Sequence, residues 1–227
     1  MDLKSRILYE DNHLLVVNKL AGEIVQGDQT GDLPLLEMVR LYIKEKYQKP
    51  GNVFCGLVHR IDRPVSGAVI FAKTSKALTR MNQQVKERKL RKIYWAVVEN
   101  EPRDVEKKLI HYLRKNQKLN KSFVVTFPKE GYLQSELNYK VVGKSERFFL
   151  LEVELITGRH HQIRAQLSFE GFPIRGDLKY GAPRANRDGS ISLHAAGLFF
   201  EHPTSKEMIR IEAPILSEEL KKIWYNR

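Results

Sequence analysis

Hydrophobic and polar residues alternate over many short segments of this chain, and a period of two residues is typical of β-strands. Near the start, the runs at residues 7–10 and 13–18 flank Asp11 and Asn12, which predicts a hairpin with a two-residue turn. Composition and alternation predict further strands at residues 66–73, 91–100, 109–113, 122–127, 134–142, 147–155, 191–199 and 207–212.

Helical spacing of apolar residues occurs in fewer places. It predicts helices over residues 34–47, over 75–89 behind a Thr74-Ser75 cap, within "TGRHHQIRAQLSFEG" up to Gly171, and over 217–225. Residues 172–190 have the composition of a long loop. Many strands with a few interspersed helices predict an α+β fold with a mixed, mostly antiparallel central sheet, flanking helices and loops. We expect one domain over residues 1–227, with two sublobes that share one sheet.

The net charge of the chain indicates which class of partner it binds. The chain has 39 Lys and Arg against 27 Asp and Glu, a net charge of +12. A basic excess of this size indicates a polyanionic partner, most often nucleic acid. A DNA-binding protein and a basic protein without such a partner remain alternatives at this point.

Other features bear on the compartment. The apolar runs are far shorter than the roughly 20 residues of a membrane helix, so we expect no membrane partner. The first residues lack the pattern of a secretory signal, and Cys55 is the single cysteine, which rules out an internal disulfide. Together these observations favour the cytoplasm.

Several common catalytic patterns are absent. The sequence has no GxGxxG, no P-loop, no HExxH, no CxxC and no GxSxG. His160 and His161 are adjacent, so on a helix they would point about 100° apart and would not share a metal ion. These absences do not favour a hydrolase or a metalloenzyme.

The clearest chemical candidate is Asp62, which lies between Arg60 and Arg63 in "LVHRIDRPVSGAVIFAKT". A carboxylate just beyond a short apolar stretch is partly desolvated, and a nearby guanidinium keeps it ionised. Such a group can serve as nucleophile or base. The alternative is an aspartate that caps a turn or forms a plain ion pair.

Two further segments supply possible partners. If a helix starts near His160, Arg164 is on its second turn beside a buried stripe, and could reach a carboxylate at a strand end. The alternative is that Arg159 and Arg164 lie on a solvated face and contact phosphates. Tyr94 follows a basic cluster formed by Lys86, Arg88, Lys89, Arg91 and Lys92. An aromatic ring beside basic side chains suits base stacking, whereas the alternative is a core tyrosine.

These segments resemble the RluA-type RNA pseudouridine synthases. The resemblance rests on "HRIDRPVSGAVIFAK", "RKIYWAVV", "ITGRHHQIRAQLS", "GDLKYG" and "LHAAGLFFEHP", in the order of the family, and extends from about residue 6 to 215. It implies the catalytic fold of that family and an isomerase that converts uridine in transfer RNA, ribosomal RNA or both to pseudouridine. It also implies that the target nucleotide leaves its stack to be modified. It further implies that the reaction needs neither a metal nor an organic cofactor.

The resemblance assigns roles to individual residues. Asp62 corresponds to the catalytic aspartate, Arg164 to the arginine that pairs with it, and Tyr94 to the tyrosine that stacks on uracil. Because the chain starts at the first hairpin, we expect no S4-type RNA-binding domain, and RNA contacts must come from the catalytic domain. The candidates for these contacts are Arg60, Arg63, Lys89, Arg91, Lys92, Arg114, Lys115, Lys118, Lys121, Arg159 and His160. We expect a monomer.

The chain departs from the family pattern at several positions. Val65 replaces a threonine before Ser-Gly, His160 replaces another threonine, Gln166 replaces a histidine, and Leu20 replaces the proline after Lys19. These departures concern the finer contacts of the substrate. A catalytically silent RNA-binding protein on the same fold is the competing hypothesis, and the presence of Asp62, Tyr94 and Arg164 argues against it.

Overall fold

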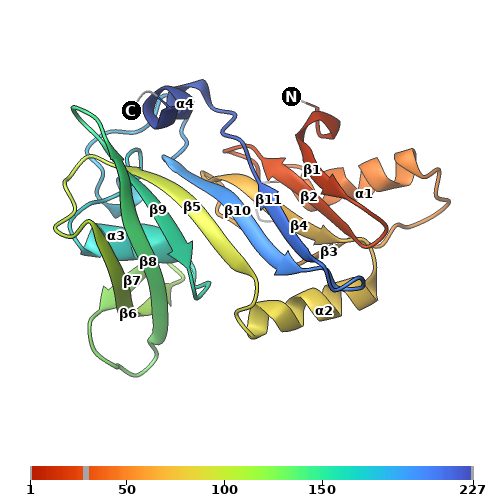
Figure 1. Cartoon of the computed structure of the whole chain (residues 1–227), viewed down its shortest axis with the longest axis horizontal. Helices are drawn as coiled ribbons and strands as arrows, with labels where there is room; N and C mark the ends of the chain where they lie inside the picture. Colours follow the sequence, from red (N-terminus) through yellow and green to blue (C-terminus); the bar gives the residue numbers. More distant parts are fainter. Residues whose placement is uncertain (1, 28–30, 226–227) are drawn as a thin grey trace. The chain divides into compact units, whose positions relative to one another are not determined.

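The computed structural model describes residues 2–27 and 31–225 (Figure 1). The chain divides into two compact units. The first consists of Met1–Leu90 and Ala195–Pro214, and the second of Arg91–His194 and Ile215–Arg227. The predicted single domain with a shared sheet stays a prediction, and each unit is described here by itself.

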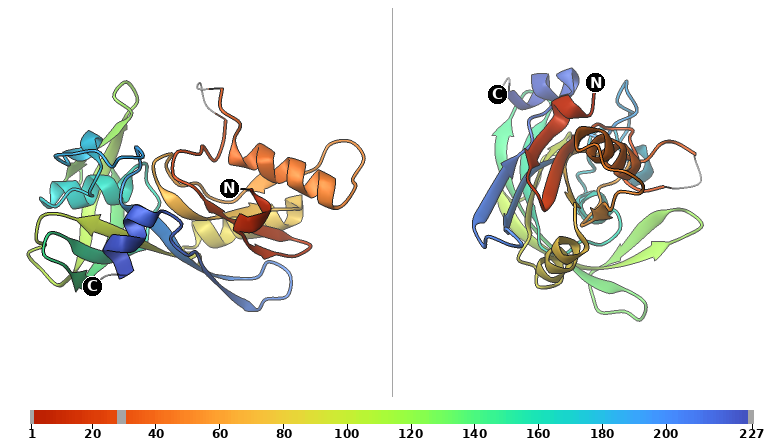
Figure 2. Two further views of the ribbon diagram at one scale, coloured as in Figure 1. Left: turned by 90° about the horizontal axis from the view of Figure 1, so that it is seen from above. Right: turned by 90° about the vertical axis from the view of Figure 1, so that its right-hand side faces the viewer.

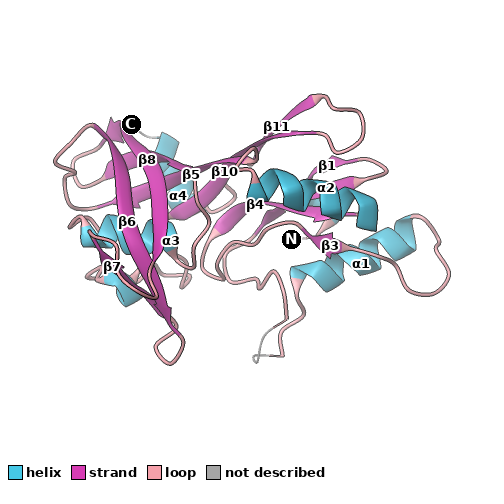
Figure 3. Ribbon diagram, turned by 90° about the horizontal axis from the view of Figure 1, so that it is seen from below, coloured by secondary structure: helices cyan, strands magenta, loops and turns pink. Residues whose placement is uncertain are grey.

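The first unit is built on antiparallel strands. They are β1 (Ile7–Glu10), β2 (Leu14–Lys19), β3 (Gly56–Leu57), β4 (Ser66–Ala72), β10 (Leu193–Glu201), which belongs to this unit from Ala195 on, and β11 (Met208–Glu212). A short 3-10 helix at Lys4–Arg6 precedes β1. The order is β1-β2-β4-β10-β11, and β3 pairs with β4. The helices are α1 (Leu35–Lys46) and α2 (Ser75–Lys86), and α2 lies over β3 and β4 (Figure 3).

The core of this unit lies between α2 and the continuous apolar runs of β2 and β4. Leu14 and Val16 of β2 and Ala68 and Ile70 of β4 point to one face, where Met81 of α2 packs against them. All five side chains are fully buried. The side-chain oxygen of Thr74 accepts a hydrogen bond from the Ala77 amide, so the predicted cap of α2 is confirmed.

Glu10 joins the hairpin to α1. Its carboxylate accepts hydrogen bonds from Tyr42 and Tyr47 at 2.8 Å, from Lys46 at 2.6 Å and from Lys73 at 3.1 Å. Burial opposes ionisation, but these donors more than offset it and lower the pKa of Glu10 to about 2.

We expect Glu10→Gln to be less stable than the wild type by about 2–3 kcal/mol at neutral pH. The pKa is depressed on folding, so the wild-type advantage is present above the ordinary pKa of glutamate. It should fade as the pH falls from about 5 towards 2. Urea unfolding of both proteins across this range measures the difference, and an advantage that does not change with pH would contradict the assignment.

Gly67 permits the close approach of β4 and β10. Its φ is +118°, and a Cβ atom there would overlap the backbone of Ala195. We expect Gly67→Ala to lower the free energy of unfolding by more than about 2 kcal/mol, because strain at positive φ and overpacking act together. Gly22→Ala is the matched control, since Gly22 has a φ of +90° with open space around it. Equal losses in urea unfolding would contradict the role given to Ala195.

The second unit contains a five-stranded antiparallel arrangement, in the order β5-β9-β8-β6-β7. The strands are β5 (Arg91–Val98), β6 (Glu106–Asn116), β7 (Lys121–Val125), β8 (Leu133–Lys144) and β9 (Phe149–Leu155). The helices are α3 (Gln162–Phe169), the short 3-10 helix η2 (Leu178–Tyr180) and α4 (Glu218–Tyr225). Figures 1 and 2 show α3 beside β6 and β7, which it contacts.

Apolar packing fixes α3 and α4 in this unit. Trp224 of α4 stacks on Trp95 of β5 with ring centroids 4.6 Å apart. Ala165 of α3 packs with Leu113 of β6 and Tyr180 of η2. These contacts explain why two short helices with little length for intrinsic stability are formed here.

The predicted α+β class is confirmed, and every pairing whose register is described is antiparallel. Two local predictions are wrong. The helix expected near His160 begins at Gln162, because His161 has a left-handed conformation with φ of 52°. The segment expected to be only a loop, 172–190, contains η2 and an isolated bridge between Ile174 and Val98.

Candidate active site

The Asp62 loop belongs to the first unit and follows β3. The Val65 amide donates to the Asp62 carbonyl at 3.0 Å, which closes a tight turn, and Val65 is 2% exposed. The apolar Val65 therefore fits a buried position. Asp62 is half-buried, Arg60 is exposed, and Arg63 pairs with Asp32 at 2.7 Å. Arg63 thus has a carboxylate partner from another loop of its own unit.

Lys19, at the end of β2, is hydrogen-bonded to the loop that carries Asp62. Its ammonium is buried and donates to the backbone carbonyls of Leu20 and Glu23 at 2.8 Å and of Arg63 at 3.1 Å. Burial lowers its pKa to about 7, although the charges of Glu23 and Asp62 act in the opposite direction. Lys19 therefore links the hairpin to the segment that carries Asp62.

The departure at Leu20 has a structural reason. The Leu20 amide donates to Glu23 at 2.9 Å, a bond that proline cannot make. Arg6 holds the same carboxylate with two hydrogen bonds of 2.7 and 2.9 Å. In this chain the turn after β2 is therefore held by hydrogen bonds to the Glu23 carboxylate instead of by a proline.

Arg164 lies in the first turn of α3, and its side chain is buried within the second unit. Its Nε and Nη2 donate to the two carboxylate oxygens of Asp177 at 2.6 and 2.9 Å. Arg164 is 5% exposed and Asp177 is 1% exposed. A guanidinium has five N–H donors, so this pair is compatible with a second carboxylate partner. Asp62 belongs to the other unit, and its pairing with Arg164 stays a prediction.

Tyr180 and His161 pack around this ion pair. The guanidinium carbon of Arg164 lies 5.1 Å from the centre of the Tyr180 ring. The Tyr180 hydroxyl accepts from the Ser122 amide at 2.8 Å and lies 3.1 Å from Nδ1 of His161. Burial and the positive charge of Arg164 lower the pKa of His161 to about 2, so its ring is neutral and can accept from Tyr180.

His160 does not point away from His161 as expected from a helix. The two rings stack with centroids 3.7 Å apart, because both residues precede α3. The carbonyl of His160 accepts from the Ser122 hydroxyl at 2.6 Å, and its Nε2 lies 3.1 Å from Asn120 Oδ1. His160 is thereby tied to the turn between β6 and β7.

Gln166 also has a specific setting. It is fully buried, and its amide nitrogen contacts Nδ1 of His111 at 3.1 Å and the Ser135 carbonyl at 3.3 Å. His111 in turn contacts Glu170 at 3.3 Å. The departure at this position therefore belongs to a polar network between α3 and the strands β6 and β8.

Tyr94 lies on β5, opposite Val153 of β9, and is 6% exposed. Asp62 belongs to the first unit and Tyr94 to the second, as does Arg164. The structure brings Arg164 together with Asp177 and Tyr180 within one unit, which the sequence did not predict.

The residues predicted to contact RNA differ in their exposure and in their contacts. Lys89 pairs with Glu87 and Arg91 with Glu154, both at 2.7 Å. Lys92 is half-buried, and desolvation lowers its pKa. Arg114 and Lys115 are exposed on β6, and Arg114 lies over the Tyr132 ring. Arg159 is exposed, and Lys121 lies over Tyr180. Of these candidates, Arg114, Lys115 and Lys121 lie on the β6–β7 hairpin.

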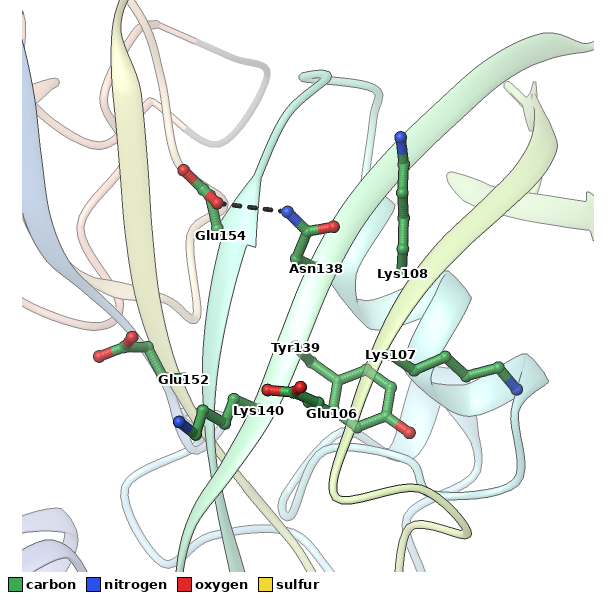
Figure 4. Close-up of a pocket in the computed structure, with 8 residues that line it drawn as sticks. All are labelled: Glu106, Lys107, Lys108, Asn138, Tyr139, Lys140, Glu152 and Glu154. Carbon is green, nitrogen blue, oxygen red and sulfur yellow. Dashed lines mark hydrogen bonds between the residues drawn. The ribbon is translucent and has the colours of Figure 1, made fainter.

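A pocket of about 450 Å³ lies over β6, β8 and β9 (Figure 4). It is lined by Tyr139 and Asn138, by three lysines and by three glutamates, Glu106, Glu152 and Glu154. The opposite charges balance, so this face does not favour a polyanion. Within residues 2–27 and 31–225, no cluster of three or more His, Cys, Asp or Glu could hold a metal ion, and no helix is long and apolar enough to cross a membrane.

Sequence reasoning missed Lys19, Asp177 and Tyr180 as parts of the site. A signal existed for Asp177 and Tyr180, which both occur in "GDLKYG". For Lys19, the signal was a lysine two residues after the apolar run of β2. Neither signal specified a partner: Arg164 lies 13 residues before Asp177, and Arg63 lies 44 residues after Lys19.

Comparison with known proteins identifies the family to which this chain is similar. Residues 13–169 match the RNA pseudouridylate synthase family. The chain is 36% identical to ribosomal large subunit pseudouridine synthase C of Buchnera aphidicola (subsp. Acyrthosiphon pisum, strain APS), covering 94% of this chain and 68% of that protein. It is 35% identical to the protein of the same name from Escherichia coli K12, covering 95% and 68%.

A solved structure shows the same fold. The human RNA pseudouridylate synthase domain containing 4 protein superimposes with a TM-score of 0.80 at 22% identity, covering 96% of this chain and 91% of that one. The predicted resemblance to the RluA type is confirmed by the family match and by these relatives. The chain belongs to the RNA pseudouridylate synthase family and is an isomerase that forms pseudouridine in RNA.

Proposed function

We propose that this enzyme converts specific uridines of large-subunit ribosomal RNA to pseudouridine. The observation that carries the proposal is the identity of 34–36% to synthases named for the ribosomal large subunit, over 94–98% of this chain. Transfer RNA is the second candidate substrate, because the resemblance covers enzymes that act on either RNA. We also propose that the protein acts in the cytoplasm as a monomer and without metal or organic cofactor.

In the proposed reaction the bond between N1 of uracil and C1′ of ribose breaks, the base turns, and C5 bonds to C1′. The C5 proton is lost and N1 gains a proton, so atoms balance without water or a cofactor. Asp62 is the reacting carboxylate, either as nucleophile or as base. Since no water is added, a second catalytic carboxylate on the opposite side of the bond is unnecessary.

Arg164 and Tyr94 are proposed to complete the site. Arg164 keeps Asp62 ionised, and its bidentate pair with Asp177 supports this role because it fixes the guanidinium plane. Tyr94 stacks on the uracil of a nucleotide turned out of its stack. The exposed basic residues Arg60, Arg114, Lys115 and Arg159 contact RNA phosphates.

The test uses purified protein and transcripts that carry tritium at C5 of uridine. We expect tritium release from a large-subunit ribosomal transcript, and chemical derivatisation followed by primer extension should map the modified positions. Release from transfer RNA transcripts alone would refute the ribosomal assignment. The absence of release from either RNA would refute the proposed function as a whole.

A further inference from the structure

A pocket of about 640 Å³ in the second unit is lined by four arginines that no role above includes. Arg147 comes from the turn between β8 and β9, Arg175 follows the bridge at Ile174, and Arg184 and Arg187 come from the loop before β10. Glu99 is the single acid among the lining residues. The pocket therefore carries a formal excess of three positive charges.

This charge distinguishes the arginine pocket from the pocket over β6, β8 and β9, where three lysines meet three glutamates. Like charges repel, so four arginines around one hollow are stabilised when an anion binds between them. An arginine fork also matches the geometry of a phosphate group better than a lysine does. The composition of the pocket thus fits a phosphate.

The four arginines of the pocket differ in their contacts. Arg175 lies over the Phe148 ring at 5.3 Å, and its amide donates to the Val97 carbonyl at 2.9 Å. Arg147, Arg184 and Arg187 are exposed. Among the residues that the structure describes, no side chain forms an ion pair or hydrogen bond with these three guanidinium groups.

The loop that carries Arg184 and Arg187 is anchored by Asn186. Asn186 is 7% exposed, and its Nδ2 donates to the hydroxyl of Ser192 at 3.2 Å. Gly176 has a φ of +88°, and a Cβ there would collide with the Asn186 side chain. The Oδ1 of Asn186 has no donor within the described part of the chain. A ribose 2′-hydroxyl is one group that could donate to it.

We infer that the arginine pocket binds a backbone phosphate of the RNA substrate, as a contact additional to the reacting uridine. The inference rests on the proposed function in one respect, because the anion is taken to belong to the RNA that is modified. Phosphate contacts fix the register of a protein on a nucleic acid without reading its sequence. A phosphate bound in the pocket then helps to fix the position of the enzyme along the RNA.

The test compares the wild type with the double variant R184Q and R187Q. The probe is an unmodified large-subunit ribosomal transcript, and its dissociation constant is measured from low to moderate salt. Loss of two charges from a phosphate contact should reduce the slope of log affinity against log salt by roughly 1–2. R184K and R187K should restore the slope, because it depends on charge. R103Q with R210Q removes two exposed arginines elsewhere and should leave the slope unchanged.

A slope equal to that of the wild type in R184Q/R187Q, or an equal fall in the R103Q/R210Q control, would overturn the inference. Equal competition by polyglutamate at matched salt would also overturn it, since the pocket would then accept any polyanion. Pseudouridine formation by the wild type is measured on the same transcript. If the wild type forms none, the proposed function fails, while the slopes still decide whether the pocket binds RNA phosphate.

Discussion

Asp62→Asn should lower the rate of pseudouridine formation by roughly 10⁴-fold or more, because a neutral amide cannot replace a reacting carboxylate. The side chain is half-buried in a tight turn, and asparagine has nearly the same shape. RNA affinity should therefore stay close to that of the wild type. Single-turnover tritium release at saturating enzyme measures the chemical step separately from binding.

Asp104→Asn is the matched control for this substitution. Asp104 is an exposed aspartate of the second unit that pairs with Lys107. Its removal should leave the rate within about twofold of the wild type. An Asp62→Asn protein that keeps more than a tenth of the wild-type rate would show that another group performs the reaction.

Arg164→Met should lower the free energy of unfolding by about 3–5 kcal/mol, because it leaves the carboxylate of Asp177 buried and unpaired. Asp177 is 1% exposed, and its two carboxylate oxygens accept hydrogen bonds from Nε and Nη2 of Arg164. The same variant should lose pseudouridine formation. Urea unfolding and tritium release are measured on one preparation, and Arg159→Met, an exposed arginine five residues earlier, should change stability by less than about 0.5 kcal/mol.

The double variant Arg164→Met with Asp177→Asn separates stability from activity. It removes the stranded charge, so it should regain a substantial part of the lost stability. It should remain inactive, because the proposed partner of Asp62 is still missing. A double variant that regains both stability and activity would show that Arg164 has only a structural role.

Strand positions could be predicted from the sequence because short β-rich runs bounded by turn residues are typical of strands. The hairpin of β1 and β2 follows from two β-rich runs around Asp11 and Asn12, and the structure has both strands. The cap at Thr74 was predicted for a similar reason, since hydroxyl side chains satisfy exposed helix amides. Local chemistry determines these features, so a single sequence contains them.

Features that depend on distant segments could not be predicted in this way. The start of α3 moved to Gln162 because His161 turns into a left-handed conformation and contacts Tyr180, nineteen residues later. Helical spacing alone placed Arg164 on the second turn and did not specify Asp177 as its partner. Motif comparison assigned Asp62, Tyr94 and Arg164, and their assembly into one site stays a prediction.

The central claim is that this enzyme forms pseudouridine in large-subunit ribosomal RNA through Asp62. The most direct measurement is a pseudouridine map of all RNAs from cells that lack the gene for this chain, complemented either with the wild type or with Asp62→Asn. We predict that defined pseudouridines in large-subunit ribosomal RNA disappear without the gene, return with the wild type and stay absent with Asp62→Asn. Unchanged maps, or equal restoration by Asp62→Asn, would contradict the claim.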